Sequence, residues 1–420
     1  MPFGFYIIMA AQFFSSLADN ALLVAAISLL ILSDSPAWMT PLLKFFFTVA
    51  YVVLAPFVGA FADALPKGHV MFISNLIKVA GCLLMLFGID PLLAYGVVGL
   101  GAAAYSPAKY GILTELLPHE RLVVANGWIE GLTVTSIILG TLLGGVLISE
   151  ALSFRLLAFD LPHIDTHIDT VPEIAITLIV LFYVVAAAFN LWVPDTGVER
   201  RVPERNPLAL VGEFAHCVKL LWTDKLGQIS LAVTTLFWGA GATLQFIVLK
   251  WAEVALGYTL SQATLLQGVC AVGIAAGAIL AARFIPLNRA TSVLPVGMAM
   301  GVVVIAMNFV GLLPVALVLM VLVGGLAGFF VVPMNALLQH RGHILMGAGH
   351  SIAVQNFNEN LSILAMLAVY ALLISLDVSI YTIIGIFGLF VTGTMYFVRR
   401  WHLANLARGP LPELPGDRGH

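Results

Sequence analysis

Polar residues with usable chemistry interrupt otherwise apolar stretches of this chain at two places with the same spacing. In each copy a proline is followed two residues later by one polar side chain and twenty-three residues later by another. The matching residues are Pro107, Lys109 and Glu130 in the first copy and Pro333, Asn335 and Asn356 in the second. A pattern used twice predicts two related halves around one polar site, with the charged members in the first half.

A carboxylate, Asp19, lies near the middle of the first apolar stretch, beside Asn20 and one helical turn from Ser15 and Ser16. A charged side chain at bilayer depth costs about 2.5 to 3.5 kcal/mol on insertion scales, so it should face a partner or an aqueous path. We interpret Asp19 as a substrate contact or a ligand for a coupling cation, either sodium or a proton. A structural ion pair is the alternative interpretation.

Lys109 follows Pro107, which frees a backbone carbonyl and loosens the helix. A flexible ammonium beside such a weak point suits an anionic head group. The alternative is that the Lys109 side chain snorkels to the inner membrane interface.

Further amides and carboxylates share helical faces in both halves of the chain. Asn126 and Glu130 are four residues apart, and Gln355, Glu359 and Ser362 share a face beside that of Asn356 and Asn360. These residues line an aqueous pathway or form interhelical hydrogen bonds of about 0.6 kcal/mol each, and their clustering favours the pathway. Trp238, Gly239, Gly241 and Gln245 indicate either a helix that bends during gating or one that is simply well packed.

The elements that must position these residues follow from composition. The chain has 420 residues, 61% of them hydrophobic and 10% charged, and its mean hydropathy is +1.03, which excludes a soluble domain. We predict an all-α polytopic membrane protein whose apolar spans are each long enough to cross a bilayer core of about 30 Å. The twelve expected spans are residues 5–32, 40–63, 70–88, 91–113, 122–149, 173–194, 226–255, 261–283, 290–310, 314–338, 347–375 and 379–399.

Lysine and arginine concentrate in the loops that lie on one side of the membrane in this arrangement. The opposite side carries only Lys44, Arg155 and Lys250, so both termini are predicted to be cytoplasmic. The expected division is a six-helix bundle at 1–194, a cytoplasmic linker at 195–225, a second six-helix bundle at 226–400 and a disordered tail at 401–420.

Three smaller features of the sequence also predict local structure. In the linker, Asn206 and Pro207 start a helix whose face of Leu210, Phe214, Cys217 and Leu221 suits an interfacial helix on the inner leaflet or a plain tether. The alternating His163, Asp165, His167 and Asp169 fit a metal site less well than an exposed acidic loop. Pairs of glycines four apart, Gly140 with Gly144 and Gly273 with Gly277, indicate close helix packing.

The sequence from Gly59 to Gly68, Gly-Ala-Phe-Ala-Asp-Ala-Leu-Pro-Lys-Gly, resembles the loop motif of the major facilitator superfamily. The resemblance implies that Gly59, Asp63, Lys67 and Gly68 gate the cytoplasmic side through charge pairs. The corresponding loop from Gly277 to Arg289 has Ala281 where an aspartate is expected, so a second latch of this kind is not predicted.

More narrowly, Ala-Asp-Asn-Ala-Leu at 18–22, Ala-Tyr-Ser-Pro-Ala-Lys-Tyr-Gly-Ile-Leu at 104–113, Phe-Phe-Val-Val-Pro at 329–333, Asn-Ala-Leu-Leu-Gln at 335–339 and Ala-Val-Gln-Asn at 353–356 resemble the bacterial lysophospholipid transporter family. The resemblance implies inward movement of lysophosphatidylethanolamine and lysophosphatidylglycerol across the inner membrane. It also implies a separate cytoplasmic acyltransferase and acyl carrier protein synthetase that restores the missing chain. The long outer loop departs from the family pattern.

The head group should therefore meet polar side chains while the acyl tail follows an apolar wall or stays in lipid. The predicted substrate-binding residues are Asp19, Asn20, Tyr105, Lys109, Asn126, Glu130, Gln245, Asn335, Gln355, Asn356, Glu359 and Asn360. We expect a monomer that binds lysophospholipid and membrane lipids, with no nucleic acid partner, no catalytic residue, no metal ligand and no cofactor beyond the coupling cation.

Two other functions fit parts of the sequence. One is an exporter of drugs or metabolites in the same superfamily. The other is a multispan lipid acyltransferase, which needs a nucleophile or a histidine paired with an acid. The sequence spacing gives His343 and His350 no such partner.

Overall fold

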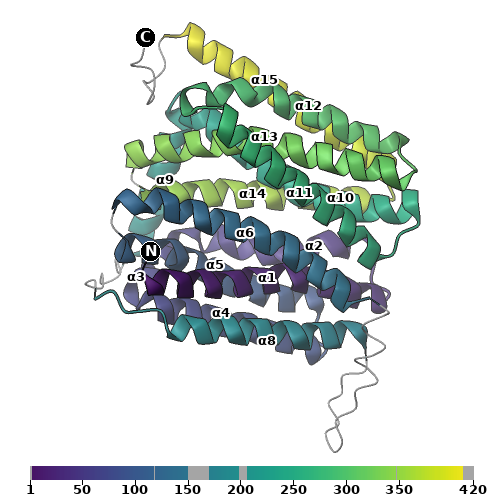
Figure 1. The fold of residues 1–420 in the computed structure, drawn as a ribbon, viewed down its shortest axis with the longest axis horizontal. Coiled ribbons are helices and arrows are strands. Elements are labelled where there is room, and N and C mark those ends of the chain that lie inside the picture. The colour runs from purple at the N-terminus through teal and green to yellow at the C-terminus, as the bar shows by residue number, and fades with distance from the viewer. Residues whose placement is uncertain (1, 118, 150–169, 198–205, 347, 410–420) are drawn as a thin grey trace, which may run out of the picture. The chain divides into compact units, whose positions relative to one another are not determined.

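The computed structural model describes residues 2–117, 119–149, 170–197, 206–346 and 348–409. In these ranges the secondary structure is helical, as predicted (Figure 1). The chain divides into two compact units. Unit 1 comprises Met1–Leu210 with Leu260–Leu265, and unit 2 comprises Val211–Thr259 with Leu266–His420.

Unit 1 is built from helices that reproduce the first six expected spans. They are α1 (Phe3–Leu32), α2 (Met39–Val53), α3 (Ala55–Ala64), α4 (Lys67–Leu86), α5 (Pro91–Leu116), α6 (His119–Leu147) and α8 (Val171–Leu191).

The expected span 40–63 is two helices, because the chain breaks at Leu54 between α2 and α3. Pro56 lies in the first turn of α3, where its missing N–H group costs nothing, whereas an unbroken helix would lose a backbone hydrogen bond there. By contrast, α5 continues through Pro107, as the sequence analysis expected.

Helix α1 packs along α6 and α8, and α4 packs on α5 and α8 (Figure 1). The α1–α6 contact depends on the predicted packing glycines. A Cβ atom at Gly144 would lie 2.8 Å from the Ala21 carbonyl oxygen, so a side chain there would force the two helices apart. Packing by Gly140 and Gly144 is therefore confirmed.

Unit 2 begins with the linker helix and contains the last six spans. Its elements are α9 (Pro207–Thr223), α10 (Gly227–Leu256), α11 (Leu260–Phe284), the 3₁₀ helix η1 (Leu287–Val293), α12 (Leu294–Ile305), the 3₁₀ helix η2 (Ala306–Phe309), α13 (Leu313–Met346), α14 (Ala348–Ser375) and α15 (Ile380–Ala407).

Within unit 2, α10 contacts α13, α14 and α15, and α12 packs on α13 and α15. Gly273 and Gly277 of α11 let that helix approach α13, since a Cβ at Gly273 would lie 3.0 Å from the Val321 Cα. Helix α15 continues to Ala407, past residue 401, where the sequence predicted that the disordered tail begins. Residues 410–420 lie outside the described part of the chain.

The interpretation of α9 as an interfacial helix is wrong for the face on which it was based. Cys217 and Leu221 are buried in a cluster with Leu231 and Leu338, and Phe214 meets Phe357 edge to face at 5.3 Å. Protein therefore covers the apolar face that the sequence analysis assigned to the leaflet.

Among the described residues, nine helices are long and apolar enough to cross a membrane. The segments outside this count are the divided α2–α3 pair, α5 and α6. The multispan membrane architecture is confirmed, and the count of twelve stays a prediction.

Candidate functional site

Asp19 of α1 lies at the centre of a polar cluster inside unit 1. Its Oδ2 accepts a 2.8 Å hydrogen bond and ion pair from the Lys78 ammonium, and its Oδ1 accepts a 2.8 Å hydrogen bond from the Tyr183 hydroxyl. The Tyr95 hydroxyl donates to the Asp19 backbone carbonyl at 3.3 Å. Helices α4 and α8 thus converge on one carboxylate of α1, and α5 contacts the backbone of the same residue. This arrangement places an ion pair among apolar helices.

Lys78 is the residue that sequence reasoning missed. Its side chain is 1% exposed, whereas that of Asp19 is 21% exposed, so Asp19 is the more accessible member of the pair. A charge buried this deeply requires its partner, and removing one partner of such a pair typically costs about 3 to 5 kcal/mol. The signal was present, since Lys78 lies inside an apolar span just as Asp19 does.

Serine and asparagine extend the cluster beneath this pair. Lys78 also donates to the Ser15 hydroxyl at 3.0 Å, and Ser15 donates to Asn75 Oδ1 at 2.8 Å. The Lys78 ammonium faces the rings of Tyr105 and Tyr183, 5.2 and 5.5 Å from their centroids, a favourable position for a cation. We call Ser15, Asp19, Asn75, Lys78, Tyr95, Tyr105, Tyr183 and Asn190 the α1–α4 cluster.

The other predicted residues of unit 1 do not join this cluster through a described hydrogen bond. Asn20 donates to the Ser16 carbonyl of its own helix at 2.8 Å. Lys109 is buried, with its ammonium 4.3 Å from the Tyr110 ring centroid, which disfavours the snorkelling alternative. The side chains of Asn126 and Glu130 lie outside the described part of the structure.

Unit 2 brings together three predicted residues from α13 and α14. The Gln355 amide donates to Asn335 Oδ1 at 2.7 Å and to Glu359 Oε1 at 2.8 Å. Gln355 and Glu359 are buried. Asn335, which the repeated pattern singled out, thus makes a polar contact, but its partner is Gln355 and not Asn356, the residue with which the pattern paired it.

The remaining predicted residues of unit 2 lie apart from this network. Asn360 donates to the Asn356 carbonyl within α14 at 2.7 Å. Gln245 is half-buried, and its backbone carbonyl accepts from the Gln267 amide at 2.9 Å. Gly239 packs against Ser362, a contact that agrees with the well-packed interpretation of this helix.

The predicted gate is only partly described. The side chain of Asp63 lies outside the described residues, as does the surroundings of Gly59. Lys67 is buried, and its ammonium donates to the Ala62 carbonyl at 2.8 Å, where a cation stabilises the last turn of α3. A Cβ at Gly68 would lie 2.9 Å from the Asn190 carbonyl oxygen, so Gly68 has a packing role. The gating role of this loop stays a prediction.

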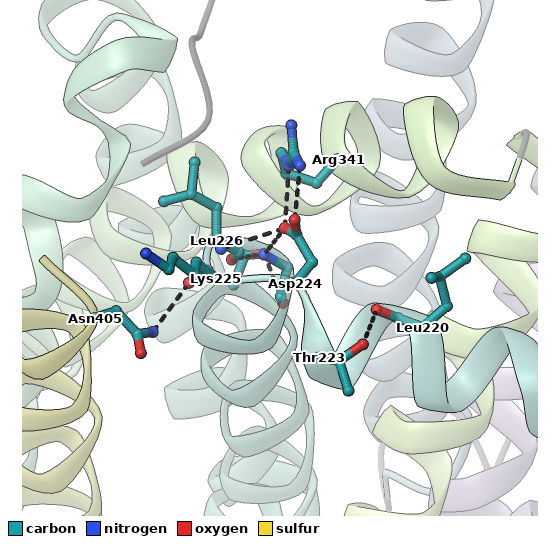
Figure 2. A network of polar contacts seen from close by, with 9 residues as sticks. Leu220, Thr223, Asp224, Lys225, Leu226, Arg341 and Asn405 are labelled. Carbon is teal, nitrogen blue, oxygen red and sulfur yellow. Dashed lines mark hydrogen bonds and ion pairs between the residues drawn. The ribbon is translucent and has the colours of Figure 1, made fainter. Parts of the chain in front are cut away.

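A charged clamp that the sequence analysis did not single out joins the start of α10 to α13 (Figure 2). Arg341 Nη2 lies 2.7 Å from Asp224 Oδ2, and Arg341 Nε donates to Asp224 Oδ1 at 3.1 Å. The same Oδ1 accepts from the backbone N–H groups of Gly227 at 2.7 Å and Leu226 at 3.2 Å. Asp224 therefore caps α10 while it pairs with Arg341.

These contacts set the ionisation of Asp224. Burial, the largest influence, raises its pKa, but hydrogen bonds from Arg341 and from the Gly227 backbone, with the guanidinium charge, outweigh it and lower the pKa below its usual 3.8. The carboxylate is thus ionised wherever the clamp is formed. Ala281 is buried in α11, where the sequence predicted no second latch, and the clamp of unit 2 lies elsewhere, between Asp224 and Arg341.

The metal and enzyme alternatives concern histidines and acids that the structure describes only in part. His163, Asp165, His167 and Asp169 lie outside them, and within them no group of three or more His, Cys, Asp and Glu residues is placed to hold a metal ion. His350 does have an acid partner that the spacing did not reveal, because its Nε2 lies 3.4 Å from Glu213 Oε1 of α9. Both side chains are more than half exposed, the geometry of a solvated surface pair.

Comparison with protein families and relatives gives one consistent result. The sequence model of the Major Facilitator Superfamily matches residues 8–358. A protein of Yersinia enterocolitica named lysophospholipid transporter LplT is 42% identical over 378 residues, which cover 90% of this chain and 89% of the relative. The protein of that name from Yersinia pestis (strain Pestoides F) is 42% identical over 377 residues, covering 90% and 88%.

Solved structures share the fold at low sequence identity. A bacterial homologue of the human lysosomal transporter Spinster, inward-facing and unoccupied, superposes with a TM-score of 0.70 at 14% identity and covers 96% of this chain and 98% of its own. PepTSo, a transporter of the POT family, gives a TM-score of 0.70 at 12% identity and covers 97% and 99%.

Proposed function

The chain belongs to the Major Facilitator Superfamily and is a lysophospholipid transporter, and from this we propose how it moves its substrate. Lysophosphatidylethanolamine and lysophosphatidylglycerol travel inward across the bacterial inner membrane by alternating access. Both termini face the cytoplasm, where a separate acyltransferase and acyl carrier protein synthetase restores the missing acyl chain.

The observation that carries this proposal is the Asp19–Lys78 ion pair inside an apolar helical unit. A lysophospholipid head group is zwitterionic or anionic and its single tail is apolar, so a carrier needs buried charge beside an apolar wall. The Asp19 carboxylate is the more accessible member of the pair. It therefore suits the ethanolamine amine or a coupling cation, sodium or a proton, as a charge-assisted partner.

The buried amides of unit 2 supply a second polar surface. Gln355 links Asn335 to Glu359, and these groups can exchange hydrogen bonds with a polar head group without requiring an unpaired charge. The phosphate contact assigned to Lys109 remains part of the proposal.

Transport without chemical change is the proposed activity, and two alternatives remain testable against it. An exporter of the same superfamily would move a cationic drug outward and ignore lysophospholipid. An acyltransferase would convert labelled lysophospholipid in the presence of an acyl donor, whereas a carrier moves the label unchanged.

The decisive experiment is uptake of labelled lysophosphatidylethanolamine into spheroplasts with and without a sodium gradient. Wild type should accumulate label, and Asp19→Asn should reduce uptake strongly at an equal amount of protein in the membrane. Lys109→Ala should also reduce uptake if Lys109 meets the phosphate. Undiminished uptake by Asp19→Asn would contradict the proposed site.

A further inference from the structure

Several buried polar atoms in the α1–α4 cluster have no hydrogen-bond partner among the described residues. They are Asn75 Nδ2, the Tyr105 hydroxyl, and Asn190 Nδ2 and Oδ1. Each buried polar group left unsatisfied costs about 1 to 3 kcal/mol, and native proteins retain few of them. Their concentration beside one ion pair therefore indicates a bound partner, either a ligand or an ordered water.

Two of the three residues that carry these atoms, Asn75 and Tyr105, lie beside the Lys78 ammonium. Asn75 is joined to Lys78 through Ser15, and the Tyr105 ring lies against the ammonium at 5.2 Å. Asn190 of α8 approaches the Tyr105 hydroxyl without meeting hydrogen-bond geometry. The unpaired atoms thus come from three helices, and two of the three residues, Asn75 and Tyr105, neighbour one buried cation.

The chemistry of the set selects an anion. An ammonium has three N–H donors, and in the described contacts Lys78 uses one for Asp19 and one for Ser15. Asn75 Nδ2, the Tyr105 hydroxyl and Asn190 Nδ2 add further donors. Of the unpaired atoms, Asn190 Oδ1 alone can accept a hydrogen bond but cannot donate one. A cation would find few acceptors here beyond Asp19, whereas a phosphodiester oxygen accepts several hydrogen bonds at once.

We propose that Lys78, Asn75, Tyr105 and Asn190 form the subsite for the phosphate of the lysophospholipid head group. This inference rests on the proposed function and deepens it. Asp19 remains the contact for the amine or cation, so opposite charges of the head group are recognised on adjacent atoms. Lys109, the phosphate contact predicted from sequence, then contributes less to phosphate binding than this subsite.

Tyr105→Phe tests the proposal, because it removes only an oxygen that is unpaired in the structure. If the hydroxyl serves no ligand, removing it should leave the discrimination between lipids with and without phosphate unchanged. If it binds phosphate, removal should leave the melting temperature equal or higher and weaken binding of phosphate-bearing lipids. Tyr370→Phe is the matched control, since Tyr370 is also a buried tyrosine but lies in unit 2, outside the proposed subsite, and its loss should not affect phosphate discrimination.

Binding is measured on the full-length protein in maltoside detergent by competition against labelled lysophosphatidylethanolamine. The competitors are lysophosphatidylethanolamine, lysophosphatidylglycerol and a monoacylglycerol with the same acyl chain and no phosphate. Wild type should prefer the phosphate-bearing lipids. Tyr105→Phe and Asn190→Leu should reduce the preference for phosphate-bearing lipids by about tenfold, which corresponds to about 1.4 kcal/mol. Tyr370→Phe should keep the wild-type preference.

Three results would overturn the inference. The first is an unchanged preference in both Tyr105→Phe and Asn190→Leu, which would leave an ordered water as the partner of these atoms. The second is a lower melting temperature in Tyr105→Phe, which would make the hydroxyl structural. The third is a preference lost in Lys109→Ala alone. If wild type binds no lysolipid at all, the proposed function itself fails.

Discussion

The Asp224–Arg341 clamp gives a stability prediction that can be worked from its geometry. In Asp224→Ala, the Arg341 guanidinium loses its carboxylate and α10 loses its cap. Breaking a buried pair costs about 3 to 5 kcal/mol. Since these side chains are 9% and 11% exposed, the low end of about 3 kcal/mol applies. The cap adds about 1 kcal/mol, so the expected loss is about 4 kcal/mol.

Asp224→Asn separates the two contributions. An asparagine keeps one oxygen to accept from the backbone N–H groups, but it removes the charge that pairs with Arg341. We therefore expect a smaller loss of about 2 kcal/mol. Arg341→Met combined with Asp224→Asn should recover part of the loss, because no buried charge is then left without its partner.

The assay is unfolding of the purified transporter in maltoside detergent, followed by tryptophan fluorescence, for the single and double variants of the cycle. Glu253→Ala is the matched control, since its pair with Lys250 is 36% and 61% exposed and should contribute no more than about 1 kcal/mol. A loss in Asp224→Ala no larger than that of Glu253→Ala would refute the reasoning. So would strictly additive effects of the Asp224 and Arg341 variants.

Three further predictions follow from the same contacts. The pKa of Asp224 is depressed in the folded state, so the stability that its carboxylate contributes should be constant from pH 8 to pH 5 and should disappear only as the pH falls below 3.8. The free energies of unfolding of wild type and Asp224→Asn, compared over a series of pH values, test this expectation. Gly144→Ala should destabilise unit 1 by about 1 to 3 kcal/mol. In Gly131→Ala, in the same helix, the added Cβ meets no atom within 4 Å, so the variant should be neutral or more stable by about 0.5 to 1 kcal/mol. The melting temperatures of the two variants test this difference. Burial, and secondarily a nearby carboxylate, raises the pKa of Cys217. Maleimide should therefore label Cys217 more slowly than it labels the new cysteine of the double variant His216→Cys/Cys217→Ser, because position 216 is exposed. Equal rates would mean that α9 does not pack on α10 and α13.

The helical membrane architecture followed from sequence because its cause is local. Runs of apolar residues must satisfy their backbone groups internally in lipid, and only helices do this within one segment. The break at Leu54 was missed because Pro56, inside the expected span 40–63, fits either the interior of one long helix or the first turn of a second helix. Helix α5 continues past Pro107, so a proline alone does not determine where a helix breaks.

The candidate site was predicted in part. Asp19, Asn335, Gln355 and Glu359 stood out because polar groups in hydrocarbon need a reason, and the structure gives each of them a polar partner. Lys109 was predicted because it lies beside a proline motif, whereas Lys78, which also lies inside an apolar span, has no such motif beside it.

What the sequence determined by itself was the set of residues that must have partners, because the cost of burying a polar group depends on the group and on the apolar segment around it. Which partners they have depends on how helices pack, and that was decided only by tertiary structure. Asp19 and Lys78 are 59 residues apart, and Asp224 and Arg341 are 117 apart. The periodicity of a single helix cannot pair residues so far apart in the sequence. How two helices cross is set by glycine contacts and by the shapes of all the side chains at their interface.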